Sequence, residues 1–202
     1  VFQLILLLGF VPYRWMMYQT KYHGKTRSEI NEMRLNADER KKLFLQLGIF
    51  GIFRTTFLKR MESSVSALRT SLDTYHKKLL AFEKGVRDGR IVSIADLSAL
   101  EASFGDEDLE VDSDLLAETT LDEINEQTYN VKKLLDDIEL EKSIIHLLDQ
   151  QLEIMAKDDS KIRKFAEYID NLRKHDPERK ILVFSYFSDT VEFLKENLFK
   201  YS

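Results

Sequence analysis

Residues 43–82 read LFLQLGIFGIFRTTFLKRMESSVSALRTSLDTYHKKLLAF, and this stretch decides the fold. Apolar residues recur in it every three or four positions for about eleven turns, which is the period of an α-helix with one buried face. The spacing predicts one long helix, or two helices with a kink at Gly48–Gly51 or at Ser63–Ser64, ending at Gly85 and Gly89. A helix with one apolar face needs a second helix to cover that face.

A second apolar stripe later in the chain supplies such a partner. It has heptad-like spacing and is apolar at seven of its eight positions, which are Val131, Leu134, Ile138, Glu141, Ile145, Leu148, Leu152 and Met155. We expect segments 43–82 and 125–156 to pack as an antiparallel pair within one chain, and an intermolecular coiled coil is the alternative. Four leucines are predicted to be buried in this pair: Leu68, Leu72, Leu148 and Leu152.

The composition fits long helices and excludes several classes of protein. The 202 residues include only 2 Pro and 7 Gly, too few for a β-sandwich with its frequent turns. The absence of Cys excludes a disulfide scaffold, a thiolate metal site and a Cys nucleophile, and a cytoplasmic location is expected. The longest apolar stretch, Val1 to Val11, is too short to span a bilayer, so we expect no membrane contact. The predicted fold class is mainly α, with long antiparallel helices.

Capping signals predict where the shorter helices of the first half begin and end. Pro12 suits the first turn of a helix that would run over residues 13–23 and end at Gly24. Thr26 and Asn36 each precede a Glu by three positions, which is the spacing of a capped helix N-terminus. Two further helices are therefore predicted to begin at these residues.

The end of the chain combines helical and strand patterns. Asp159 is placed to cap a helix that His175-Asp176-Pro177 would end. The run Lys180-Ile-Leu-Val-Phe-Ser185 is short, apolar and β-rich, as in a buried parallel strand, and an amphipathic helix over Asp189 to Phe199 follows it. This order predicts the strand-helix start of an α/β domain. Because a single strand is not stable alone, it either pairs with another molecule or belongs to a larger sheet.

Charge is unevenly distributed along the chain. Residues 1–60 carry 11 Lys/Arg against 4 Asp/Glu, net +7, whereas residues 91–160 carry 4 against 20, net −16. A basic face can attract phosphate locally while an acidic segment repels it. We divide the chain into four parts: a basic helical region (1–90), an acidic, partly disordered connection (91–120), a helical region that packs on the first (121–176) and the truncated start of an α/β domain (177–202).

The sequence contains no recognisable self-contained catalytic site. Gly24-Lys25-Thr26 is similar to the end of a phosphate-binding loop, but such a loop needs Gly where this chain has Gln19, and no strand precedes it. The four His lie far apart, and the carboxylates of residues 106–114 lack the spacing of a calcium loop. We therefore assign no catalytic, cofactor-binding or metal-binding residue.

Two short blocks resemble parts of one family of motor proteins. Residues 180–190, KILVFSYFSDT, follow a helix that begins Asp159-Ser-Lys161 and resemble motif IV, at the start of the second RecA-like lobe of superfamily-two helicases. Residues 57–64, FLKRMESS, resemble the LKRLESS block of bacterial helicase-like ATPases of the Swi/Snf family, where it precedes a helical insertion between the lobes. The helical stretch between the two blocks suits that inter-lobe region.

The resemblance implies a part of a DNA-dependent ATPase, which is a hydrolase that binds ATP and Mg²⁺ in its lobes. The family's phosphate loop, its Asp-Glu-x-His magnesium motif and its arginine-finger motifs are absent from this sequence. The fragment is therefore expected to bind no cofactor and to be non-catalytic alone. The implied partners are duplex DNA, bound weakly and without sequence preference, and the remaining lobes of the parent motor.

The resemblance also implies roles for individual residues. The candidates for nucleic-acid or inter-lobe contact are Arg54, Lys59, Arg60, Ser63 and Ser64. The motif IV residues are Phe184, Ser185, Tyr186 and Phe187. Lys and Arg on a long helix commonly form a solvated face, which is the alternative interpretation of the first set. For the whole chain, the alternative is an independent helical scaffold or adaptor whose last strand completes the sheet of a protein partner.

Overall fold

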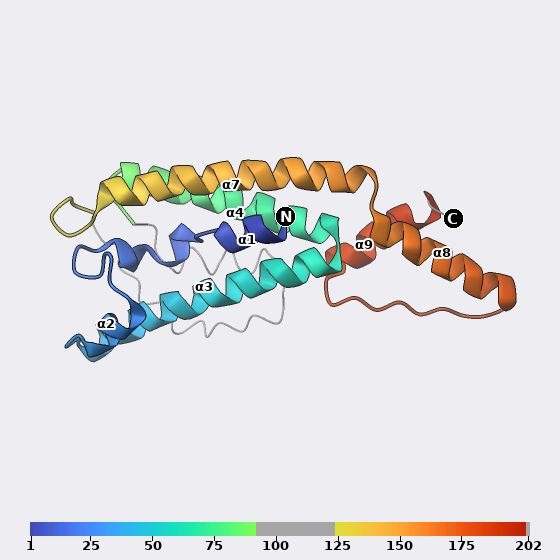
Figure 1. Ribbon diagram of the computed structural model, residues 1–202, viewed down its shortest axis with the longest axis horizontal. Coiled ribbons are helices and arrows are strands. Elements are labelled where there is room, and N and C mark those ends of the chain that lie inside the picture. The colour runs from blue at the N-terminus through green and yellow to red at the C-terminus, as the bar shows by residue number, and fades with distance from the viewer. Residues whose placement is uncertain (92–123, 201–202) are drawn as a thin grey trace.

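The computed structural model describes residues 1–91 and 124–200, and within these ranges the protein is mainly α-helical (Figure 1). Nearly all of the predicted acidic connection at 91–120 lies outside the described residues. None of the described helices has both the length and the apolar character that a bilayer span requires. The elements, with η for a 3-10 helix, are α1 (Phe2–Leu7), η1 (Val11–Tyr13), η2 (Trp15–Tyr18), α2 (Arg27–Glu32), α3 (Ala37–Ser63), α4 (Val65–Arg87), α7 (Val131–Lys157), α8 (Ser160–His175), α9 (Ser188–Asn197) and η4 (Leu198–Lys200).

The stretch that decides the fold forms two helices joined by a sharp reversal. Ser64 is extended, with φ −156° and ψ 157°, and its backbone N–H donates to the carbonyl of Arg60 to close α3. Its Oγ accepts a hydrogen bond from the backbone N–H of Ala67 at 3.0 Å, which caps α4. Of the two predicted break points, Ser63–Ser64 is correct, and α3 continues through Gly48 and Gly51.

The predicted antiparallel pairing is confirmed for α4, which packs along α7, whereas α3 packs on α4 and on the N-terminal segment (Figure 1). The apolar stripe of α7 faces the apolar stripe of α4, so each helix covers the other's buried face. The buried side chains of the α7 stripe are thus covered by other segments of the same chain. All four leucines predicted to lie in the interface are buried: Leu68, Leu72, Leu148 and Leu152.

The N-terminal segment, residues 1–22, lies among α3, α4 and α7 and completes the core. The helix predicted over residues 13–23 is wrong, because the chain forms the separate turns η1 and η2 there and Phe10 adopts a left-handed conformation with φ 47°. Side chains on all sides of the segment are apolar, and a regular helix would leave part of them in water. The irregular path buries nine of them: Ile5, Leu8, Phe10, Val11, Tyr13, Trp15, Met16, Tyr18 and Tyr22.

The predicted capping signals are confirmed at three helices. Thr26 and Glu29 form a capping box on α2, and Asn36 accepts from the backbone N–H of Glu39 on α3. Asp159 caps α8, which ends at His175 as predicted. Each cap satisfies backbone N–H groups that have no partner inside the helix.

The strand predicted over Lys180–Ser185 is not formed. A strand needs a neighbouring strand to pair its backbone groups, and no strand is formed among the described residues. The apolar side chains that a sheet would cover are instead open to solvent, with Leu182 82% exposed and Phe184 88% exposed. The helix predicted after the strand is present as α9.

Candidate functional site

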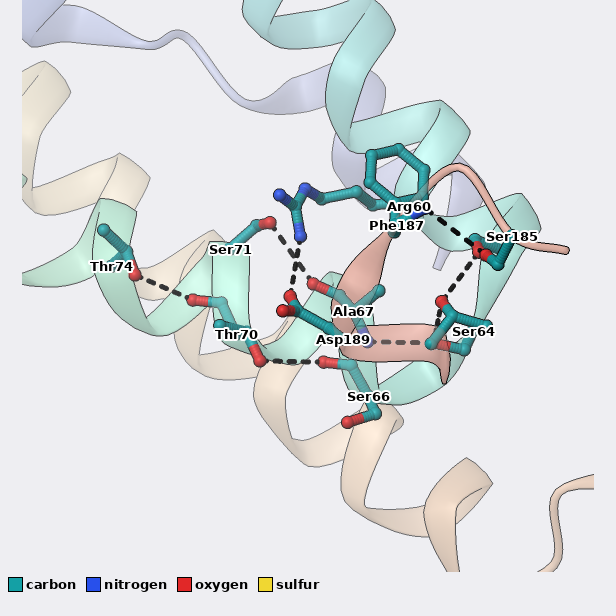
Figure 2. A network of polar contacts seen from close by, with 12 residues as sticks. Arg60, Ser64, Ser66, Ala67, Thr70, Ser71, Thr74, Ser185, Phe187 and Asp189 are labelled. Atoms are coloured by element: carbon teal, nitrogen blue, oxygen red, sulfur yellow. Dashed lines mark hydrogen bonds and ion pairs between the residues drawn. The ribbon is translucent and has the colours of Figure 1, made fainter. Parts of the chain in front are cut away.

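The two family-like blocks, far apart in the sequence, lie against each other at one end of the helical bundle (Figure 1), and Figure 2 shows their polar contacts from close by. The first block spans the α3–α4 reversal, and the second spans the segment that leads into α9. We call this contact the junction and define it by Lys59, Arg60, Ser63, Ser64, Lys161, Tyr186, Phe187, Asp189 and Thr190. Its polar contacts link residues up to 129 positions apart.

Arg60 is the charged centre of the junction. Its Nη1 donates to Oδ2 of Asp189 at 2.9 Å, and its guanidinium carbon lies 4.7 Å from the ring centroid of Phe187. The Arg60 side chain is 3% exposed, whereas that of Asp189 is 29% exposed. A buried guanidinium needs an opposite charge nearby, and Asp189 supplies it from the first turn of α9, where a carboxylate also suits the helix dipole.

Three hydroxyl groups form a second link between the helices. Thr190 Oγ1 on α9 lies 2.8 Å from Ser63 Oγ and 3.0 Å from Ser64 Oγ. A hydroxyl can donate one hydrogen bond and accept others, so the three groups can bond in sequence. Ser64 therefore both caps α4 and contacts α9.

Lys161 forms the third link, from the first turn of α8. Its ammonium group donates to the backbone carbonyls of Glu62 and Ser63, the latter at 2.8 Å. These carbonyls end α3 and have no acceptor role within the helix, and a cation there also complements the helix dipole. Asp159 holds the start of α8 in place, because its Oδ1 accepts from the backbone N–H of Lys161 at 3.0 Å.

A pocket of about 370 Å³ lies beside these contacts. Its polar wall includes Ser63, Ser64 and Thr190. Its apolar wall comes from α8, α9 and the extended segment before α9, and comprises Ile162, Phe165, Val183, Phe184, Phe193 and Leu194. The pocket shows that the junction is only partly packed.

Lys59 joins the junction at its solvent side. Its Nζ lies 5.8 Å from the ring centroid of Tyr186, and the residue remains exposed. Of the motif IV side chains, Phe187 is buried, while Ser185 accepts from the backbone N–H of Phe187 at 3.3 Å. The structure thus brings Lys59 and Arg60 of the first predicted set against Tyr186 and Phe187 of the second, while Ser63 and Ser64 contact Thr190 in the same block.

Arg54 is the predicted site residue that the structure places elsewhere. Its Nη2 donates to the carbonyl of Leu6 at 3.0 Å, and its guanidinium carbon lies 4.7 Å from the ring centroid of Phe50. The bond to Leu6 holds α1 on α3, whereas the contact with Phe50 lies within α3. The side chain therefore fastens the N-terminal segment and is not part of the junction.

A second polar centre, which the sequence interpretation missed, anchors the N-terminal segment. Glu141 is the polar residue of the α7 stripe and is buried, with Oε1 accepting from the N–H of Phe10 at 2.6 Å and Oε2 from that of Val11 at 3.0 Å. Burial raises the pKa of Glu141, and the two amide bonds oppose this rise only in part. The sequence signal that could have indicated this buried centre is the position of Glu141 within an otherwise apolar stripe.

Among the described residues, no group of three or more His, Asp or Glu side chains is placed to hold a metal ion. The described chemistry of the junction is therefore that of a contact: one ion pair, one set of hydroxyl bonds and one capped helix end. No family model, no curated protein and no solved structure matches this chain.

Proposed function

We propose that the chain is the helical inter-lobe region of a Swi/Snf-type, DNA-dependent helicase-like ATPase. The observation that carries the proposal is the junction. Two blocks that resemble the same family in the same order also make direct contact, through Arg60 with Asp189 and Ser64 with Thr190. Sequence similarity alone did not require that contact. In the parent protein, the lobes would bind ATP and Mg²⁺ in the cytoplasm, and this region would hold the second lobe in register.

The geometry favours inter-lobe contact over DNA contact for most of the first block. Arg60 and Ser64 are buried and already bonded to α9, so they present little to a phosphate. Lys59 is exposed, and a Lys ammonium can contact a phosphate without reading sequence. DNA contact in this region would therefore be weak and would depend on Lys59.

The segment before α9 supports the presence of a RecA-like lobe in the parent protein. Leu182, Phe184 and Tyr186 are exposed, whereas Val183 and Phe187, which alternate with them, are less so. Alternation with a period of two is the pattern of a strand. We propose that these residues become the first strand of the second lobe once its other strands cover them.

The same exposed segment also favours the second candidate, an independent helical scaffold whose last strand completes the sheet of a protein partner. Both candidates need a neighbouring strand. They differ in where that strand is encoded, in the same chain for the motor and in another protein for the scaffold.

The coding sequence that flanks residues 1–202 on both sides distinguishes the motor from the scaffold. The motor requires a phosphate loop upstream and an arginine-finger motif downstream. The protein encoded by the whole frame should then hydrolyse ATP with stimulation by duplex DNA, and Asp189→Asn should reduce that stimulation. Asp149→Asn is the matched control, because Asp149 pairs with Arg69 on exposed surface away from the junction. A reading frame that lacks both motifs would contradict the motor proposal and favour the independent scaffold.

A further inference from the structure

We infer that the described chain consists of two bodies joined by a releasable polar latch. The first body is the bundle, formed by residues 1–91 and 124–157. The second is the C-terminal unit, residues 158–200. The latch comprises the Arg60–Asp189 ion pair, the hydroxyl bonds of Ser63 and Ser64 to Thr190, and the bonds of Lys161 to the end of α3.

Among the described residues, the apolar core of the bundle does not extend into the C-terminal unit. The core of the bundle is one continuous cluster that reaches from Ile5 to Leu152 and joins the N-terminal segment, α3, α4 and α7. The buried apolar residues of the C-terminal unit do not belong to that cluster, and they are Ile162, Ala166, Ile169 and Phe187. Because no shared core fuses the bodies, their relative position depends on the contacts at the junction.

The contacts between the bodies are an ion pair, hydrogen bonds and the cation–ring contacts of Lys59 and Arg60, and a pocket lies beside them. The pocket of about 370 Å³ is lined by Ser63 and Ser64 from the bundle and by α8, α9 and the segment before α9 from the C-terminal unit. Small, polar contacts between bodies permit relative motion, whereas large apolar interfaces prevent it. The incomplete packing therefore points to a contact that can open.

The covalent connection is short and does not continue the helix. α7 ends at Lys157, and Asp158 leaves the helical conformation with φ −142° and ψ 80° before Asp159 caps α8. Rotation about the backbone of Asp158 would swing α8 and α9 together, since α8 packs on the 3-10 helix that ends α9. Asp158 is thus placed as the pivot of the motion.

The Arg60–Asp189 pair is placed to control the latch. Arg60 belongs to the bundle and is almost fully buried, whereas Asp189 belongs to the unit and is reached by water. Charge-assisted hydrogen bonds are stronger than neutral ones, so this pair, in which both partners are charged, is a stronger link than the hydroxyl bonds of Thr190. Asp189→Asn removes the charge but keeps the size of the side chain, and Thr190→Val removes both hydroxyl bonds with a side chain of the same shape.

Pulsed EPR on the full chain tests the latch, and this test does not depend on the proposed function. The chain contains no Cys, so spin labels can be placed at two introduced cysteines without further changes. Asp136→Cys on α7 and Glu167→Cys on α8 are exposed positions on the two bodies. Asp73→Cys on α4, paired with Asp136→Cys, reports on the bundle alone.

The expected result is one main distance between the bodies in the wild-type background and a second, broader population with Asp189→Asn or Thr190→Val. The distance within the bundle should stay unchanged in both variants. Asp149→Asn, which breaks an exposed ion pair within the bundle, should change neither distance. The inference is overturned if both latch variants keep the wild-type distance between the bodies, or if they broaden the distance within the bundle to the same extent.

Discussion

Replacing Leu148 by Ala tests whether α7 is held by the apolar face it shares with α4. Leu148 is 1% exposed, and the next residue in the chain, Leu147, is 48% exposed on the same helix. The two substitutions remove the same atoms from adjacent positions. Leu and Ala also have similar helix propensity, so any difference between the variants reports packing.

The expected magnitude follows from burial. Truncation of a fully buried Leu costs about 2–5 kcal/mol, because it removes apolar contacts and leaves a cavity. For a chain of this size, each kcal/mol lowers Tm by roughly 2–4 °C, so Leu148→Ala should lower Tm by roughly 4–20 °C. The Leu147→Ala variant should remain within about 0.5 kcal/mol of wild type, as is usual for surface positions.

Thermal unfolding followed by far-UV circular dichroism measures both variants. Urea unfolding should give the same ranking, with m-values that match the wild type if the native state keeps its compactness. Equal and small effects of the two substitutions would refute the packing of α4 on α7. A larger effect of Leu147→Ala would show that the outward face of α7 is the covered one.

The remaining predictions concern the buried carboxylate and the two ligand classes. Because burial raises the pKa of Glu141, its contribution to stability is fully present below the unfolded pKa and is lost as pH rises through the folded pKa. Glu141→Gln should therefore flatten the fall in Tm with rising pH, and exposed Glu139→Gln should not. The chain alone should not hydrolyse ATP; turnover that Lys25→Ala abolishes would contradict this expectation. Duplex DNA should bind no more tightly than a Kd of roughly 10⁻⁴ M at physiological salt. Lys59→Ala should weaken this binding at low salt, as seen in fluorescence anisotropy, whereas Lys132→Ala should leave it unchanged.

The long helices were predictable because their apolar periods are local signals. The stripe of α7 could be read from spacing, since side chains three and four positions apart share a helix face. The caps at Thr26, Asn36 and Asp159 were predictable for the same reason. Each depends on residues within one turn of the helix end. The break at Ser64 was only one of the alternatives, and its sharp reversal was not predicted.

The path of the N-terminal segment could not be predicted, because its structure is set by partners far away in sequence. Pro12 does lie in the first turn of a 3-10 helix, but the left-handed Phe10 and the short turns follow from the groove that receives them. The burial of Glu141 was unpredictable for the same reason, since its hydrogen-bond donors are the backbone amides of that irregular segment. Local spacing says nothing about such donors.

Within the candidate site, the structure brings parts of the two family-like blocks together, but it does not bring every residue of the predicted set there. Arg60 and Ser64 face α9, while Arg54 is directed to the N-terminal segment, although all three lie in or beside one helical block. Lys161 entered the interpretation only as part of a family-like helix start. Its bonds to the end of α3 depend on the fold bringing α8 there.

The anchoring of the N-terminal segment has a consequence for the order of events during synthesis. The amides of Phe10 and Val11 leave the ribosome well before the carboxylate of Glu141, which accepts their bonds and follows 131 and 130 residues later. Contacts between such distant residues are entropically slow to form. Until α7 has been translated, nine apolar side chains at the start of the chain have no completed groove to enter. Nascent chains that stop before residue 131 should therefore expose this segment to chaperones and proteases, and the bundle should fold only after α7 emerges.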